Sequence, residues 1–356
     1  MEHLLVTIAG LWLLVLILRS MIRVALIHRH YRDWFAEAVG VVVYRAVSLR
    51  LRINRDIKVL HPVLLWLFPA YLLLLILVYF VGAMTAFTLL YWGMGAVNTW
   101  RQAFLASGSS LNTLGFATPT TSAGQWLSVP EGALGLGIVV FLFTFIPGYQ
   151  AIIRAREDKT SQLYVRTGDQ PTGVALLLWY QRANIASNMR DVWEAWEDWF
   201  RMLGDTHSIL PMLTMSPSVQ ENQSWILAAA AVLDAATFAA CSVETADTES
   251  ARICVRTGTR ALLAIAEALG RVCHDTDHQA QDPSRERYEE TRACLRTAGM
   301  TLMSEASLEI QWKEFLAYRR QYEPALLFVA RQTFAPMECL LTDVRNSSAV
   351  VADIRS

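Results

Sequence analysis

Residues 113–118 have the composition best suited to chemistry in this sequence. They read Thr-Leu-Gly-Phe-Ala-Thr and lie near the end of a nearly uncharged segment, 97–119, which Gly108 and Pro119 interrupt. The segment is apolar enough to lie at membrane depth but too interrupted to cross a membrane as one helix. Non-helical backbone occurs at that depth only where it is buried in protein or lines a water-filled path. Carbonyl oxygens of such backbone, directed at a common axis, can replace the hydration shell of a cation.

A second group of reactive side chains lies further along the chain. Cys273, His274 and His278 combine a thiol with two imidazoles at a four-residue spacing, which are the ligand types of a zinc site. The group leads straight into the hydrophilic segment 279–290, which is typical of a solvated connection, so we expect a polar loop here and no metal. The other cysteines form no CxxC pair and are expected to be reduced packing groups (Cys241, Cys254, Cys294 and Cys339).

Motifs of known reactions are missing from the sequence. It contains no GxGxxG after a strand pattern, no Walker loop, no GxSxG, no HExxH and no EF-hand loop. The sequence therefore predicts no enzyme, no cofactor and no nucleotide-binding regulatory domain. A net charge of −1 without a long basic run also argues against a nucleic-acid partner.

Apolar segments must position the loop at 97–119. Of the 356 residues, 54% are hydrophobic and 18% are charged, and residues 62–100 and 132–153 contain no Asp, Glu, Lys or Arg. This concentration excludes disordered and disulfide-scaffold classes and argues against a wholly soluble globule. It predicts a signal-anchor span in 1–22, with its positive charges after the apolar run, and further spans within 62–92 and 132–153.

Charge and composition divide the chain into five parts. We expect the anchor at 1–22, a basic interfacial segment at 23–60, a two-helix module with a re-entrant loop at 61–153, a polar linker at 154–173 and a helical domain at 174–356. Nine Lys/Arg lie in 19–60 and one lies in 93–131. The positive-inside rule therefore places 19–60 and 154–356 in the cytoplasm and 93–131 outside. The prediction is a multi-pass protein of the cell membrane with its N-terminus outside.

The order of span, short helix, Thr-x-Gly-Phe loop and second span resembles the two-transmembrane pore module of tetrameric potassium channels, whose filter reads T-V-G-Y-G. The resemblance covers residues 62–153 and implies an all-α membrane fold and a homotetramer in the lipid bilayer. It also implies a monovalent cation, K⁺, that passes along the carbonyls of five filter residues: Thr113, Leu114, Gly115, Phe116 and Ala117. In this family pattern Gly115 takes a positive φ and Phe116 braces the filter against the pore helix.

The loop departs from that family at three positions. Leu114 stands for the valine, Ala117 for the second glycine and Thr118 for the acidic residue that usually follows. An alanine held in the left-handed region costs about 1–2 kcal/mol, which leaves open a weakly selective or sodium-passing channel. The alternative of another class is a membrane-anchored signalling or scaffold protein that conducts nothing and binds a partner through its helical domain.

Helices around the loop are expected to pack in two ways. A short helix over 97–110 is predicted to pack through its large apolar residues (Trp100, Phe104 and Leu105). The second span carries a small-residue face for close helix approach (Gly132, Gly135 and Gly137).

Pro147 and Gly148 are candidates for a kink and gate, with a simple helix end as the alternative. The absence of a regular arginine repeat argues against a voltage sensor, and the sequence does not indicate another stimulus.

Helical periodicity continues through the chain after residue 173. Apolar residues recur at three- and four-residue steps over 185–203, with Glu197 and Arg201 paired on the opposite face. We interpret the tryptophans of this stretch as core residues rather than a ligand cage (Trp193, Trp196 and Trp199). Residues 225–241 are apolar but short, which favours a buried helix over a span. Further helices are expected over 250–272, 286–306, 307–322 and 324–344, the last opened by Pro324. No ligand or protein partner of this domain follows from the sequence.

Overall fold

The computed structural model describes residues 1–26, 33–53, 57–169, 171–185, 189–220, 222–244, 248–273 and 284–335, with side chains except at 50–60 and 271–273. Regular structure in these ranges is helical, apart from one isolated antiparallel bridge between Val243 and Leu302. The all-α fold expected from the sequence is confirmed over this part of the chain. The chain divides into two compact units, Met1–Ala46 with Pro69–Ala151 and Val47–Phe68 with Ile152–Ser356.

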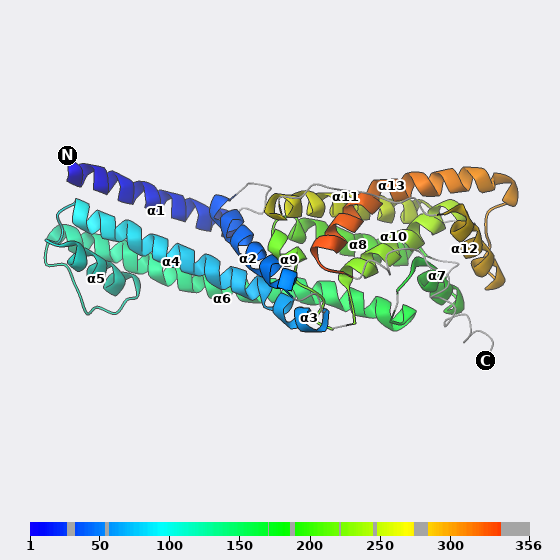
Figure 1. The fold of residues 1–356 in the computed structure, drawn as a ribbon, viewed down its shortest axis with the longest axis horizontal. Helices are drawn as coiled ribbons and strands as arrows, with labels where there is room; N and C mark the ends of the chain where they lie inside the picture. Colours follow the sequence, from blue (N-terminus) through cyan, green and yellow to red (C-terminus); the bar gives the residue numbers. More distant parts are fainter. Residues whose placement is uncertain are drawn as a thin grey trace. The chain divides into compact units, whose positions relative to one another are not determined.

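The first unit contains the predicted loop. It is built from α1 (Glu2–Leu26), the start of α2 (Trp34–Ile53), α4 (Leu67–Gly93), α5 (Trp100–Leu111) and the first part of α6 (Ser122–Thr167). In this unit α1, α4 and α6 lie side by side, and α5 lies at the end where α4 finishes and α6 begins (Figure 1). α1 runs antiparallel to α4, because His3 Nδ1 lies 3.3 Å from the Trp92 carbonyl oxygen and Ser20 Oγ lies 2.9 Å from the Tyr79 hydroxyl. The N-terminus and α5 therefore lie at the same end of the unit.

Glycines allow α1 to approach α4 closely. A methyl group at Gly10 would lie 2.9 Å from the Ala86 carbonyl oxygen, and one at Gly93 would lie 2.5 Å from Thr7 Oγ1. Close contacts of this kind hold helices together in lipid, where the hydrophobic effect gives no net attraction between them. Pro69 lies in the first turn of α4, where a proline costs little because its missing N–H has no partner there.

Four helices among the described residues are long and apolar enough to cross a membrane: Glu2–Val24, His61–Gly93, Ser122–Thr167 and Trp225–Ser242. The most apolar windows of the first three are 17%, 39% and 6% buried, whereas that of the fourth is fully buried. The first three thus expose apolar surface that only lipid or another subunit would cover, which is typical of a membrane protein. The 225–242 helix buries its apolar surface within its own unit.

The second unit is a helical bundle. It contains α3 (Ile57–Leu65) and the last part of α6, followed by α7 (Gly173–Arg182), α8 (Arg190–His207), α9 (Pro211–Thr214), α10 (Trp225–Ser242), α11 (Thr248–Cys273), α12 (Arg285–Thr297), the 3₁₀ turn η1 (Glu305–Ser307) and α13 (Leu308–Gln332). α10 is buried along its whole length and contacts α7, α11 and α13. The prediction of a buried helix over 225–241 is therefore confirmed.

The tryptophans of α8 belong to the core, as expected. Trp193, Trp196 and Trp199 are buried, and Trp196 Nε1 donates a hydrogen bond of 3.0 Å to the Tyr180 hydroxyl. The opposite face of α8 is exposed, as its amphipathic sequence predicts. The predicted ion pair between Glu197 and Arg201 is present there, at 2.5 Å.

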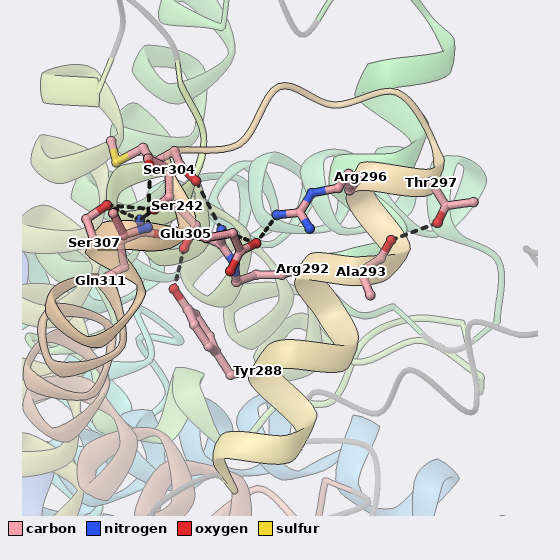
Figure 2. A network of polar contacts seen from close by, with 12 residues as sticks. Ser242, Tyr288, Arg292, Ala293, Arg296, Thr297, Ser304, Glu305, Ser307 and Gln311 are labelled. Carbon is pink, nitrogen blue, oxygen red and sulfur yellow. Dashed lines mark hydrogen bonds and ion pairs between the residues drawn. The ribbon is translucent and has the colours of Figure 1, made fainter.

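A network of polar side chains joins α12 to η1 and α13 (Figure 2). The buried Arg292 donates to the Gln311 side chain and, at 3.1 Å, to the Met303 carbonyl oxygen, while Arg296 pairs with Glu305. The helix predicted over 286–306 ends at Thr297, because the chain beyond it is extended. There, Met303 N–H donates to the Ser242 carbonyl oxygen at 2.9 Å.

Two helices continue where the sequence predicts breaks. α6 runs through most of the expected linker, 154–173, and ends at Thr167, because this polar stretch is rich in good helix formers. α13 runs through Pro324, so two separate helices over 307–322 and 324–344 are wrong for the part that the structure describes. A proline inside a helix costs about 3 kcal/mol, which the burial of Tyr322, Leu326 and Phe328 around it offsets.

Candidate functional site

α5 is a short helix with a capped start. The Thr99 side chain accepts a hydrogen bond of 3.2 Å from the Gln102 N–H, which satisfies one of the free donors of the first turn. Its packing side is formed by four small residues (Ala103, Ala106, Ser107 and Ser109) and by Leu111 at its end. Ala103 and Ala106 join a cluster with residues of α4.

The predicted packing side of this helix is wrong. Trp100, Phe104 and Leu105 are 48%, 50% and 38% exposed in the chain. Small side chains allow α5 to lie closer to α4 than indole or phenyl rings would, so the helix turns its large residues outward. These residues are available to lipid or to a neighbouring subunit.

The backbone turns sharply where α5 ends. Thr113 has φ +56° and Gly115 has φ +72°. The positive φ expected for Gly115 is confirmed, and it requires no strain because glycine has no Cβ. Thr113 carries a strain of about 1–2 kcal/mol instead. The left-handed alanine expected at Ala117 is wrong, because positive φ occurs at Thr113 and Gly115 and not at Ala117.

Ser109 organises the loop from within α5. Its carbonyl oxygen accepts from Leu114 N–H at 2.8 Å and from Gly115 N–H at 3.5 Å, and its hydroxyl accepts from Ala117 N–H at 3.0 Å. None of the described peptide bonds is cis. In a planar trans peptide the carbonyl of the preceding residue points opposite to the N–H. The carbonyls of Thr113, Leu114 and Phe116 therefore point away from Ser109.

Most of the five predicted filter residues lie on an open surface. Thr113, Leu114, Gly115 and Phe116 are exposed and Ala117 is half-buried. Phe116 is 64% exposed, so in a single chain its ring does not brace the loop. The structure thus brings these residues together on one turn, with several carbonyls pointing away from Ser109.

Glu131 is a buried acid behind the loop that the sequence analysis did not single out. It lies in α6 and is fully buried. Its Oε2 accepts a hydrogen bond of 2.8 Å from the Tyr91 hydroxyl of α4, and its Oε1 accepts one of 2.5 Å from the Ser107 hydroxyl of α5. The sequence could have pointed to this residue, because Glu131 is the one acidic residue in the stretch 57–156. An isolated acid inside an apolar region indicates function by default.

The glycine face of α6 meets the end of α5. A methyl group at Gly135 would lie 1.9 Å from the Leu111 carbonyl oxygen, and one at Gly132 would lie 3.4 Å from that of Ser110. Gly137 has no atom within 4 Å of such a methyl group. The expected close helix approach is therefore found at Gly132 and Gly135, directly before the loop.

Pro147 and Gly148 lie inside α6, which continues to Thr167. The alternative of a simple helix end at these residues is therefore wrong. Both are exposed, and a methyl group at Gly148 would meet no atom within 4 Å. Their role as a kink and gate stays a prediction.

Further along α6, within the second unit, Arg156 is fully buried. Its guanidinium donates to the Pro217 carbonyl oxygen at 3.2 Å, lies 3.3 Å from His207 Nε2 and stacks over the Trp225 ring at 5.3 Å. It also pairs with Glu157 at 2.8 Å. Arg156 therefore fixes the last part of α6 to the bundle, in addition to any contribution that its charge makes to the positive-inside orientation.

The candidate metal ligands His274 and His278 lie outside the described residues, and the side chain of Cys273 is also outside them. Among the residues that the structure describes, no three His, Cys, Asp or Glu side chains form a group suited to a metal ion.

Comparison with known proteins gives no relative. No protein-family model, curated protein or solved structure matches the chain. A function therefore has to be inferred from the geometry of the loop and its supports.

Proposed function

We propose that this chain is the subunit of a homotetrameric cation channel in the cell membrane, with K⁺ as the permeating ion. The observation that carries the proposal is the loop after α5, whose N–H groups are directed at Ser109 and whose carbonyls of Thr113, Leu114 and Phe116 point away from it. Carbonyl oxygens presented in this way can replace the water around a cation. The C-terminal end of α5, with its partial negative charge, lies beside the same turn.

A ring of several chains is needed because one loop cannot surround an ion. The fourfold ring comes from the resemblance to tetrameric potassium channels. It is supported by the exposed apolar residues of α6 in the single chain (Val129, Leu136, Val139, Val140 and Phe143). Neighbouring subunits or lipid would cover this surface.

The orientation in the membrane is also part of the proposal. The antiparallel pairing of α1 with α4 brings His3 next to Trp92, at the end of the unit that carries α5. This agrees with an external N-terminus and an external loop, since the basic residues of 19–60 favour the cytoplasm. The helical domain then lies in the cytoplasm, where it serves assembly or regulation.

Ion flux through the purified protein in liposomes tests the proposal, with K⁺ inside and Na⁺ outside. Gly115→Ala introduces a side chain at φ +72° in the loop, and we expect it to abolish flux. Gly95→Ala is a matched control, because Gly95 has φ +65°, no atom within 4 Å of the added methyl group, and a position outside the loop. We expect Gly95→Ala to conduct like the wild type.

The reversal potential of the wild type distinguishes the remaining interpretations. A value near the K⁺ equilibrium potential supports a potassium channel, and a value near zero supports the weakly selective or sodium-passing alternative. No flux together with a monomer or dimer by mass would favour a membrane-anchored scaffold protein. Equal flux in wild type and Gly115→Ala would refute the assignment of the loop as the conducting element.

A further inference from the structure

We infer that Glu131 is a positioning residue that sets the ion preference of the loop by holding the last turn of α5 in place. This inference rests on the proposed function. It concerns a side chain of α6 that does not belong to the loop itself and does not contact the ion.

Three helices meet at the Glu131 carboxylate. Tyr91 comes from α4, Ser107 from α5 and Glu131 from α6, and each of the two carboxylate oxygens accepts one hydroxyl. The carboxylate is fully buried. Because the two hydrogen bonds reach Glu131 from two different helices, this arrangement fixes the rotation of α5 about its own axis.

The last turn of α5 transmits this position to the loop. Ser107 and Ser110 face Glu131 and its partner Tyr91, since the Tyr91 hydroxyl, which donates to Glu131, also lies 3.4 Å from Ser110 Oγ. Ser109, between them, is also buried and accepts the N–H groups of the loop. A rotation of α5 that breaks the contacts of Ser107 also moves Ser109. Because the carbonyls of the loop are set by these N–H contacts, the spacing of the carbonyls changes with them.

A carboxyl side chain suits this role because it offers one oxygen to each of the two neighbouring helices. Both of its oxygens are acceptors, and both of its partners are hydroxyl donors. The Ser107 hydroxyl also lies 3.0 Å from the Met84 carbonyl oxygen, an acceptor to which it can turn when the carboxylate is removed. Loss of Glu131 therefore releases α5 toward a different partner instead of merely weakening one contact.

The test compares isosteric deletions of one buried hydroxyl on the same helix. Tyr91→Phe removes a donor to Glu131, whereas Tyr79→Phe removes a buried hydroxyl that contacts Ser20 of α1, away from α5. We expect Tyr91→Phe to lower the K⁺/Na⁺ permeability ratio about fivefold and Glu131→Ala to lower it about 25-fold, the order of one and two lost hydrogen bonds. Tyr79→Phe should leave the ratio unchanged at a similar loss of thermal stability. Glu131→Gln, which keeps one of the two acceptor oxygens, should lower the ratio less than Glu131→Ala does.

The readout is the bi-ionic reversal potential of tetramers reconstituted in liposomes, with oligomer mass and melting temperature measured alongside. If the wild type conducts selectively and Tyr91→Phe and Glu131→Ala conduct with an unchanged permeability ratio, Glu131 is only structural and the inference is wrong. Equal changes in Tyr91→Phe and Tyr79→Phe would overturn it as well. If the wild type itself passes no ions, the proposed function fails and the inference with it.

Discussion

A methyl group at Gly135 tests whether α6 sets the position of the loop. In Gly135→Ala the new Cβ would lie 1.9 Å from the Leu111 carbonyl oxygen, against 3.4 Å for an ordinary contact, so α5 and α6 must separate by up to the difference, 3.4 − 1.9 = 1.5 Å. Leu111 is the last residue of α5, two positions before Thr113. A shift of this size displaces the end of α5 and, with it, the loop that Ser109 holds.

The energetic effect has two opposing contributions. Overpacking costs about 1–3 kcal/mol, and replacing glycine by alanine inside a helix gains about 0.5–1 kcal/mol. Gly137→Ala makes the same exchange on the same helix with no atom within 4 Å of the new methyl group, so it keeps only the gain. The difference between the two variants therefore isolates the contact, at about 1–3 kcal/mol.

Thermal denaturation of the detergent-solubilised full chain and K⁺ flux in liposomes provide the two readouts. We expect Gly135→Ala to melt below Gly137→Ala and to lose most of its flux, while Gly137→Ala melts at or slightly above the wild type and conducts normally. If Gly135→Ala melts with Gly137→Ala and conducts like the wild type, the close approach of α6 to α5 does not position the loop.

Three further predictions concern the helical bundle and are tested by chemical denaturation of the full chain in detergent. Arg156→Met should destabilise the bundle by about 3–5 kcal/mol, whereas Arg154→Met, two residues away and exposed, should change stability by less than about 0.5 kcal/mol; equal effects would contradict the role of Arg156 as an anchor. Burial and the neighbouring Arg156 hold the pKa of His207 well below its usual range, so the imidazole takes up a proton when the protein unfolds. Stability should therefore fall as the pH drops below about 6.5, by up to about 1.4 kcal/mol per pH unit. A slope of stability against pH that is unchanged in His207→Gln would refute this. Tyr322→Phe removes the 2.6 Å hydrogen bond from the Tyr322 hydroxyl to Asp234 and should cost about 1–3 kcal/mol, and an unchanged denaturation midpoint would show that this buried hydrogen bond is not stabilising.

Local composition was sufficient to predict the apolar helices and the loop between them. Long apolar runs and the three-residue spacing of Trp193, Trp196 and Trp199 are properties of neighbouring residues, and the structure reproduces both. The positive φ of Gly115 was implied by the resemblance to the channel filter, and the structure has it as well. The same holds for the buried helix at 225–241, whose apolar run is too short for an ordinary span.

Helix ends and packing sides were predicted less well, because distant residues decide them. Pro324 does not begin a helix, since the burial of its neighbours offsets the lost hydrogen bond. The expected packing side of α5 is reversed, because the space between α5 and α4 admits Ala103 and Ala106 but not Trp100 and Phe104. The sequence of α5 by itself does not indicate how wide the space between α5 and α4 is.

The sequence by itself determined that this chain has apolar helices that suit a membrane, an interrupted uncharged segment between two of them, and a helical domain after them. Only the tertiary structure decided which groups support the loop. Glu131, Tyr91 and Ser107 are separated by as many as 40 positions along the chain, and their contact depends on how three helices pack. A hydrogen bond forms over about 3 Å whatever the separation along the chain, so the hydrogen bonds of Glu131 behind the loop can be identified only when the helices are in place.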